Sequence, residues 1–167
     1  MSIGDAVARA TEYLTAHPDE ARYRDSAATA RVGDGLVARV TGPGGESLTT
    51  DMPAGIGGTA SAPSPGWLLR AAAASCVASL VAIRAASTGV AHGAIEVTVD
   101  SESDDRGILG LDDAIDAGAL SLKVVVSVNG VRDATLRPIV DWAIRHCPVT
   151  DTIARSVPIE IQLAGDR

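Results

Sequence analysis

The sequence of 167 residues contains no phenylalanine, and only 2% of its residues are aromatic. A core made from this chain must therefore be filled by alanine, valine, leucine and isoleucine. Lysine occurs only once, at Lys123, and the formal net charge is −7. A negative charge of this size disfavours nucleic acid and anionic membrane as main partners, and we expect neither.

Histidine and cysteine are also scarce, which limits the metal chemistry open to the chain. The three histidines, His17, His92 and His146, and the two cysteines, Cys76 and Cys147, offer none of the short spacings that a zinc site needs. Several aspartates gather in an acidic segment, but it lacks the regular carboxylate spacing and fixed glycine of a calcium loop. We therefore expect no metal ion and no other cofactor.

The chain does not open with a basic segment followed by an apolar run, so we expect no signal peptide. Its longest weakly polar run, residues 66–86, is interrupted by Arg70 and Arg84, which disfavours a membrane span. A hydrophobic content of 46% and a charged content of 21% are typical of a globular protein, and the length is that of one domain. We expect a cytoplasmic protein whose thiols are reduced at rest.

The order of the expected elements is that of an α+β domain with antiparallel sheet. Apolar residues at helical spacing predict a helix over residues 2–16, with Ser2 and Asp5 as a capping pair. Alternation and glycine-rich turns predict a meander of two or three strands over residues 26–50. The later elements are a long helix at 65–88, strands at 94–103 and 120–129 joined by an acidic loop, a helix from Asp133, which caps it, to Cys147, a helical turn at 150–154, and a last strand at 157–163.

The long helix carries the first cysteine and has clear ends. Ser64 is placed to cap it, Pro65 to occupy its first turn and Gly89 to end it. Two interpretations of Cys76 are open: a small apolar group in the core, or a reactive thiol whose pKa is lowered by an arginine from another element. The stripe that holds Cys76 at helical spacing consists of Leu69, Ala72 or Ala73, Cys76, Leu80 and Ile83.

The second cysteine follows a helix and precedes Pro148. Because the last turn of a helix disfavours a thiolate, Cys147 is better suited to resolve an oxidised thiol than to attack a substrate. We interpret His146, beside it, as a solvated residue rather than a base. Two isolated cysteines in different elements are more typical of a two-thiol redox site than of a zinc site.

Two segments resemble the OsmC/Ohr family of thiol-dependent hydroperoxide reductases: GGTASAPSPGWLLRAAAASC, which contains Cys76, and HCPV, which contains Cys147. The resemblance covers roughly residues 26–163, so we divide the chain into an N-terminal helical extension (1–24) and an OsmC-like domain (25–167). It implies an OsmC-like fold, in which antiparallel sheets wrap around two long central helices of an intertwined homodimer.

The resemblance also implies the chemistry. Cys76 would attack an organic hydroperoxide and become a sulfenic acid, and Cys147 would then condense with it to a disulfide. A dithiol, such as a lipoyl group on a carrier protein, would reduce that disulfide. In this family an arginine from the first strand region activates the attacking thiol, and Arg39 is our favoured candidate. The other candidates are Arg31, Arg70 and Arg84.

One departure from the family leaves two functions open. The peroxidases of the family place a glutamate in the turn after the proline that opens the long helix, where it holds the arginine against the thiolate. Gly66 and Trp67 occupy these positions here. The first function is a peroxidase-like organic hydroperoxide reductase or redox-stress protein. The alternative is a non-catalytic small-molecule binder with an apolar pocket over Cys76 and Trp67 as a wall.

Overall fold

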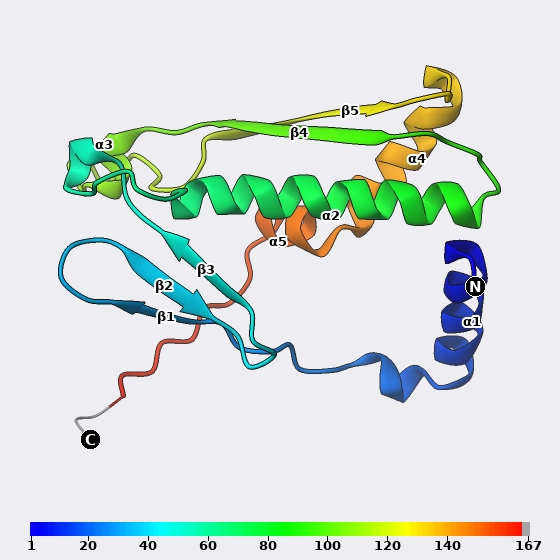
Figure 1. Ribbon diagram of the computed structural model, residues 1–167, viewed down its shortest axis with the longest axis horizontal. Helices are drawn as coiled ribbons and strands as arrows, with labels where there is room; N and C mark the ends of the chain where they lie inside the picture. Colours follow the sequence, from blue (N-terminus) through cyan, green and yellow to red (C-terminus); the bar gives the residue numbers. More distant parts are fainter. Residues whose placement is uncertain (165–167) are drawn as a thin grey trace.

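One long helix, α2 (Pro65–Ser87), crosses the computed structural model, which describes residues 1–164 (Figure 1). Both of its ends agree with the sequence analysis. The Trp67 N–H donates to the Ser64 hydroxyl at 3.2 Å, and Pro65 occupies the first position. Gly89, just beyond the end, adopts a φ of +69°, which a glycine reaches without strain.

A two-stranded antiparallel sheet, β4 (Ile95–Glu102) and β5 (Ser121–Val128), covers one side of α2 (Figure 1). Exposed and half-buried residues alternate along both strands, so that one face packs on the helix and the other meets solvent. Helices α4 (Asp133–His146) and α5 (Pro148–Ala154) pack beside α2. The core between these elements consists of Val77, Val81, Ala85, Val128, Ile139, Ala143 and Cys147.

A second antiparallel sheet has the order β1 (Thr29–Val32), β2 (Ala38–Thr41), β3 (Ser47–Thr50), which confirms the expected meander. It lies apart from the layer that contains α2 (Figure 1), and its residues are mostly exposed. Val32 keeps 57% of its surface exposed and Leu48 keeps 41%. This sheet therefore has no core of its own within the described chain.

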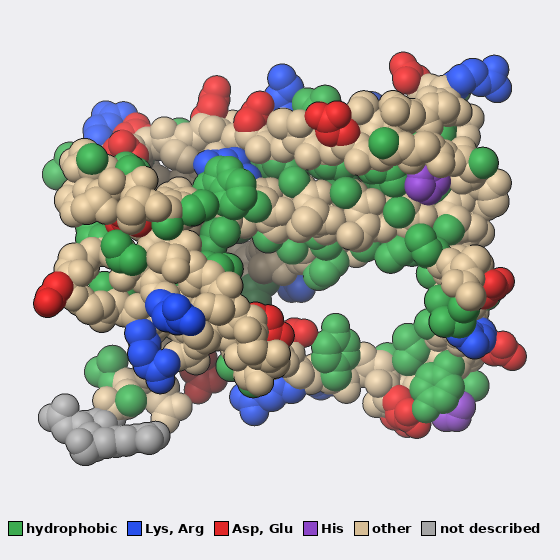
Figure 2. All heavy atoms as spheres, in the orientation of Figure 1, with side chains coloured by type: hydrophobic (Ala, Val, Ile, Leu, Met, Phe, Trp, Pro, Cys, Tyr) green, Lys and Arg blue, Asp and Glu red, His purple; other side chains and the backbone are tan. Residues whose placement is uncertain are grey.

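The N-terminal helix α1 (Ile3–Ala16) begins with the expected capping box, in which Ser2 and Asp5 each accept a backbone hydrogen bond at 3.1 Å. It packs against the end of α2, where a Cβ at Gly4 would lie 3.3 Å from the Ala86 carbonyl oxygen. Space remains open between α1 and the β1–β3 sheet, beneath α2 (Figure 2). The remaining short helices are η1 (Pro18–Ala21), η2 (Ala54–Ile56) and, within the expected acidic loop, α3 (Asp105–Ile108).

Two details of the helices were predicted wrongly. Asp133 does not cap α4, because the helix begins at this residue, and Arg132 is the N-cap without a side-chain hydrogen bond. On α2 the buried stripe is offset from the expected one, because the sheet and α4 cover a neighbouring face. Cys76 and Leu80 only flank this stripe, and Leu69 is 41% exposed. The buried stripe consists of Ala73, Val77, Val81 and Ala85.

The expected last strand, residues 157–163, is extended coil in the described chain. A strand needs hydrogen bonds from a neighbouring edge, and none of the strands β1 to β5 pairs with this segment. Its apolar side chains alternate along the segment and are largely exposed: Val157 by 42%, Ile159 by 88%, Ile161 by 83% and Leu163 by 89%. The alternation typical of a strand is present, but within residues 1–164 no neighbouring strand pairs with it.

By length and composition alone, α2 could cross a membrane, since the mean hydropathy of its most apolar 18 residues is 1.7. Core helices pass the same test. Both arginines on α2 bind neighbouring elements: Arg70 donates to Ser101 on β4, and Arg84 stacks on Trp142 of α4. Only 17% of the 18-residue window is buried, so much of α2 lacks cover within one chain.

The loop between β3 and α2 is built around Asp51, a carboxylate with 2% exposure. Its oxygens accept hydrogen bonds from the Met52 N–H (2.7 Å), from the Thr59 hydroxyl (2.6 Å) and N–H (3.1 Å), and from the Ser61 hydroxyl (2.9 Å) and N–H (3.0 Å). These bonds, that of the Thr59 hydroxyl first, hold the pKa of Asp51 well below its usual range. The carboxylate thereby fixes the approach of the chain to α2.

We expect Asp51→Asn to lower the melting temperature at pH 7, because an amide cannot accept all of these bonds. The lowered pKa means that the carboxylate stabilises the fold above its unfolded pKa, about 3.9, and that this contribution disappears as the pH falls through the folded value. Thermal unfolding at pH 7 and pH 2 should therefore show a larger difference between variant and wild type at pH 7. Asp34→Asn, in the exposed turn after β1, is the control. An equal loss in both variants would contradict this role for Asp51.

Candidate active site

The two cysteines, far apart in the sequence, lie in contact in the structure. Cys76, on α2, is half-buried and packs against the core that contains Cys147. Cys147 is fully buried at the single residue that joins α4 to α5. Each thiol shifts the pKa of the other, as expected for two sulfurs that lie close together. The structure thus brings together the two residues that the sequence analysis assigned to the redox site.

The sequence analysis saw Cys147 only at the end of α4, but this residue is also the N-cap of α5. Burial opposes its ionisation, yet the nearby Cys76 thiol and the polar groups of Thr150 and Val149 lower the pKa of Cys147. The Thr150 hydroxyl donates to the Ile144 carbonyl at 2.7 Å and so ties the two helices together. The helix junction therefore favours the Cys147 thiolate, contrary to the expectation from α4 alone.

Cys76 has the opposite tendency. Burial raises the pKa of its thiol, and so does the neighbouring Cys147, whereas the Val149 N–H acts against this rise. No cation contributes to the balance. Cys147 is therefore the more acidic thiol of the pair, and Cys76 is the more accessible one.

Within residues 1–164, none of the four candidate arginines is in place to activate Cys76. Arg39 is exposed on β2, directly opposite Arg31 on β1, in the sheet that lies apart from α2. Arg70 donates from Nη1 to the Ser101 hydroxyl at 3.0 Å. Arg84 lies 5.0 Å from the centre of the Trp142 ring. The role of Arg39 thus stays a prediction, and one chain alone does not fulfil it.

No acidic side chain stands at the two positions where the peroxidases of the family carry their glutamate. Gly66 lies in the first turn of α2, and Trp67 is 50% exposed. Asp51, the nearest acid before them in the sequence, is committed to its own loop. His146 is exposed and stacks on Trp142 with ring centres 4.3 Å apart, as expected for a residue that is not a base for Cys147.

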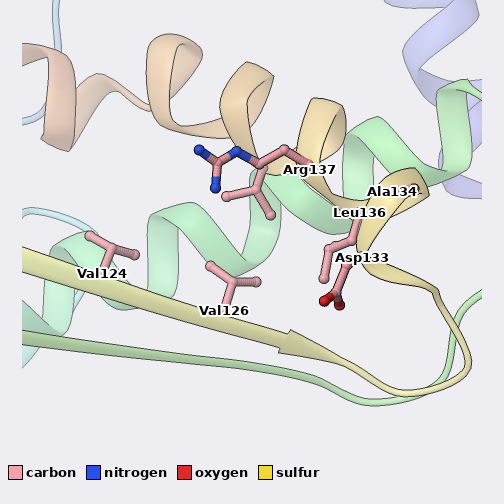
Figure 3. A pocket seen from close by; sticks show the side chains of 7 residues that line it. Val124, Val126, Asp133, Ala134, Leu136 and Arg137 are labelled. Carbon is pink, nitrogen blue, oxygen red and sulfur yellow. The ribbon is translucent and has the colours of Figure 1, made fainter.

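Two cavities lie along the inner face of β5, and neither cysteine is part of their lining. One, of about 270 Å³, lies between β5, α2 and α5 and includes Ala73, Leu122 and Thr150, but not Trp67, in its lining. A wider one, of about 550 Å³, separates β5 from α4 (Figure 3). Its walls are Val124, Val126, Leu136 and Val140, with Asp133 and Arg137. Within residues 1–164, no group of three or more potential ligand side chains could hold a metal ion.

Comparison with known proteins identifies the relatives of this chain. The family described as OsmC-like protein matches residues 58–162, whereas no curated protein sequence matches. Among solved structures, an OsmC-like protein from Mycoplasma pneumoniae superposes with a TM-score of 0.68 at 13% identity over 80% of this chain and 89% of that one.

Two further solved structures show how varied these relatives are. An organic hydroperoxide resistance protein from Legionella pneumophila gives a TM-score of 0.62 at 21% identity over 79% of this chain and 90% of that one. An OsmC-like protein of unknown function from Vibrio cholerae gives 0.63 at 11% identity, over 78% and 94%. At such identities, the likeness shows the α+β fold and not the activity.

The electrostatics of the pair predict how Cys76 titrates. In Cys147→Ser the thiol remains partly buried, so the rate of alkylation of Cys76 by iodoacetamide should rise with a midpoint at higher pH than in the unfolded protein. The same variant unfolded in urea is the control, measured over the same pH range. A midpoint below that of the unfolded protein would mean that an arginine reaches the sulfur after all.

Proposed function

Because the chain belongs to the OsmC-like protein family, we propose that it is a peroxidase-like enzyme that reduces organic hydroperoxides through Cys76 and Cys147. The observation that supports this proposal best is the contact between the two thiols, which come from α2 and from the junction of α4 and α5. A disulfide requires its two cysteines to be close, with Cα atoms less than about 7 Å apart. Organic hydroperoxide resistance proteins are among the structural relatives.

The exposure of the two sulfurs supports the order of events. Cys76 is half-buried and can meet a substrate, whereas Cys147 has no exposed surface. In the first step the Cys76 thiolate attacks the peroxide oxygen, the O–O bond breaks, the alcohol leaves with one proton, and Cys76 becomes a sulfenic acid. In the second step the Cys147 thiolate attacks the Cys76 sulfur, the S–O bond breaks, and the hydroxide that leaves takes up one proton from solvent to become water. A dithiol reductant, of the lipoyl type, then restores both thiols and is itself oxidised.

The pKa of Cys147 suits its proposed role, whereas the pKa of Cys76 does not. A lowered pKa at Cys147 keeps a resolving thiolate available beside Cys76. A raised pKa at Cys76 means that the thiolate needed for the first step is scarce at neutral pH. We therefore expect the first step to limit the rate within one chain and to accelerate as the pH rises.

The second candidate function is a non-catalytic small-molecule binder. The observations that favour it are that no charged group of residues 1–164 lowers the pKa of Cys76, and that an apolar cavity of about 270 Å³ lies between β5, α2 and α5. In this case Cys76 would be a core residue, and hydroperoxide would leave both thiols unchanged.

We also propose that two chains form an intertwined homodimer. The uncovered surface of α2, the β1–β3 sheet without a core and the unpaired segment 157–163 are three surfaces that one chain leaves open. Ala30, Val40 and Leu48 are cross-strand neighbours on one face of that sheet, and Arg31 and Arg39 lie on the other. Arg39 can activate Cys76 only if the second subunit brings it there.

The function predicts a specific pattern of oxidation. One equivalent of cumene hydroperoxide should convert the wild type to a Cys76–Cys147 disulfide, detected by thiol counting and mass spectrometry. Cys147→Ser should stop at a sulfenic acid on Cys76 and lose turnover, whereas Cys76→Ser should not react. Hydrogen peroxide should react more slowly, since each buried methylene of an organic peroxide contributes about 0.8 kcal/mol to binding. Intact thiols in the wild type after treatment would exclude the peroxidase and leave the binder.

The proposed dimer has two measurable consequences: the mass of the protein in solution, and the effect of a substitution in segment 157–163 on that mass. Light scattering at micromolar concentration should give twice the chain mass of 16.9 kDa. Ile161→Asp should shift the mass toward the monomer, because it places a charge on the apolar side of the unpaired segment. Glu160→Gln, one residue earlier and so on the other side of an extended chain, is the control. A folded wild-type monomer would remove the proposal, and so would a dimer that Ile161→Asp leaves unchanged.

A further inference from the structure

A separate cavity of about 520 Å³ lies at the start of α2, away from both cysteines. It is enclosed by the first turns of α2, the loop after β3, and the segments before and after α3, beside the first residues of β5. Most of its lining is apolar, and neither Cys76 nor Cys147 contributes to it. Its apolar lining includes Met52, Ile56, Leu69, Ile108 and Leu122.

The cavity contains one cation that is not neutralised by the chain. Arg70, half-buried in the wall, uses Nη1 to donate to the Ser101 hydroxyl at 3.0 Å. No carboxylate of residues 1–164 lies within 4.0 Å of its guanidinium nitrogens. A guanidinium has five N–H donors in a planar fork that matches a carboxylate. A largely apolar cavity with such a fork in its wall suits a ligand with one carboxylate and an apolar body.

Gly66 keeps this site open. It lies four residues before Arg70 on the same face of α2, and a Cβ built there would be 3.9 Å from Nη1 of Arg70. An acidic side chain at position 66 would therefore reach the guanidinium and occupy it from within. Glycine leaves that volume to an external carboxylate.

The other charges around the cavity limit the charge of its ligand. Asp104 is bound by the Arg106 guanidinium, which helps to hold its pKa at about 2, so the two residues form a neutral pair. Asp105 is exposed at the same end and carries no salt bridge among residues 1–164. One arginine facing one exposed aspartate favours a single negative charge over a dianion.

We propose that this cavity binds a small monocarboxylate with an aliphatic or aromatic body. The carboxylate pairs with Arg70 beside Ser101, and the apolar body lies against Leu69, Ile108 and Leu122. This site is distinct from the thiol pair and does not depend on the peroxidase function.

The test uses octanoate as the probe, with isothermal titration calorimetry on the full-length protein. Octan-1-ol has the same hydrocarbon chain without the charge and should bind at least about tenfold more weakly, since a charge-assisted hydrogen bond is roughly twice as strong as a neutral one. Gly66→Glu should also weaken octanoate at least about tenfold, whereas Gly66→Gln, of equal size but neutral, should stay within about threefold of the wild type. Arg70→Gln should lose binding, and Arg137→Gln, outside this cavity, should keep it.

Each outcome decides the proposal. Equal affinity for octanoate and octanol, or equal effects of Gly66→Glu and Gly66→Gln, would show that Arg70 does not hold a carboxylate and would overturn it. Unchanged octanoate binding in the double variant Cys76→Ser, Cys147→Ser would support a site independent of the thiols. Loss of binding in that folded double variant would instead assign octanoate to the thiol site and remove the separate cavity.

Discussion

The structure depends on the burial of one thin helix. α2 is rich in alanine and serine, so neighbouring elements can approach its backbone closely, and the sheet β4–β5 and helix α4 do so on one side. That burial places Cys76 against Cys147 and fixes the two thiols in a shared core. On the other side, residues 1–164 supply no comparable cover, and only 17% of the most apolar 18 residues of α2 is buried. This uncovered side of α2 is the observation on which the proposed homodimer rests.

Burial also sets the chemistry of the thiol pair. Moving a thiol from water into an apolar core penalises its charged form, so both sulfurs resist ionisation. At Cys147, polar groups at the start of α5 outweigh this penalty and lower the pKa. At Cys76, the neighbouring Cys147 raises the pKa further. The more acidic thiol is thus the buried one. In the proposed cycle, the lowered pKa of Cys147 favours closure of the disulfide, whereas the raised pKa of Cys76 opposes the first oxidation.

Much of this fold could be predicted from local patterns. The capping residues Ser2 and Ser64 and the terminating Gly89 correctly bounded two helices, because caps act within a few residues. Segment 157–163 has the alternation of a strand, but a strand forms only against an edge, and none of the strands β1 to β5 offers one to it. The sequence identified both cysteines. It did not reveal that Cys147 starts α5, because Pro148 reads equally well as the end of one helix and the beginning of the next.

The absence of an acid at position 66 has two consequences at once. At the thiol site, positions 66 and 67 supply no carboxylate that could orient an arginine toward Cys76, and burial keeps the pKa of this thiol raised. On the face that meets β4, the same absence leaves Arg70 with a single hydrogen bond to Ser101 in a largely apolar cavity. A half-buried cation is stable only if water or an anion satisfies its remaining donors. Gly66 therefore has two effects: it supplies no carboxylate to the thiol site, and it leaves the Arg70 guanidinium open to an external carboxylate. The ligand chemistry of this chain is thereby separate from its thiol chemistry.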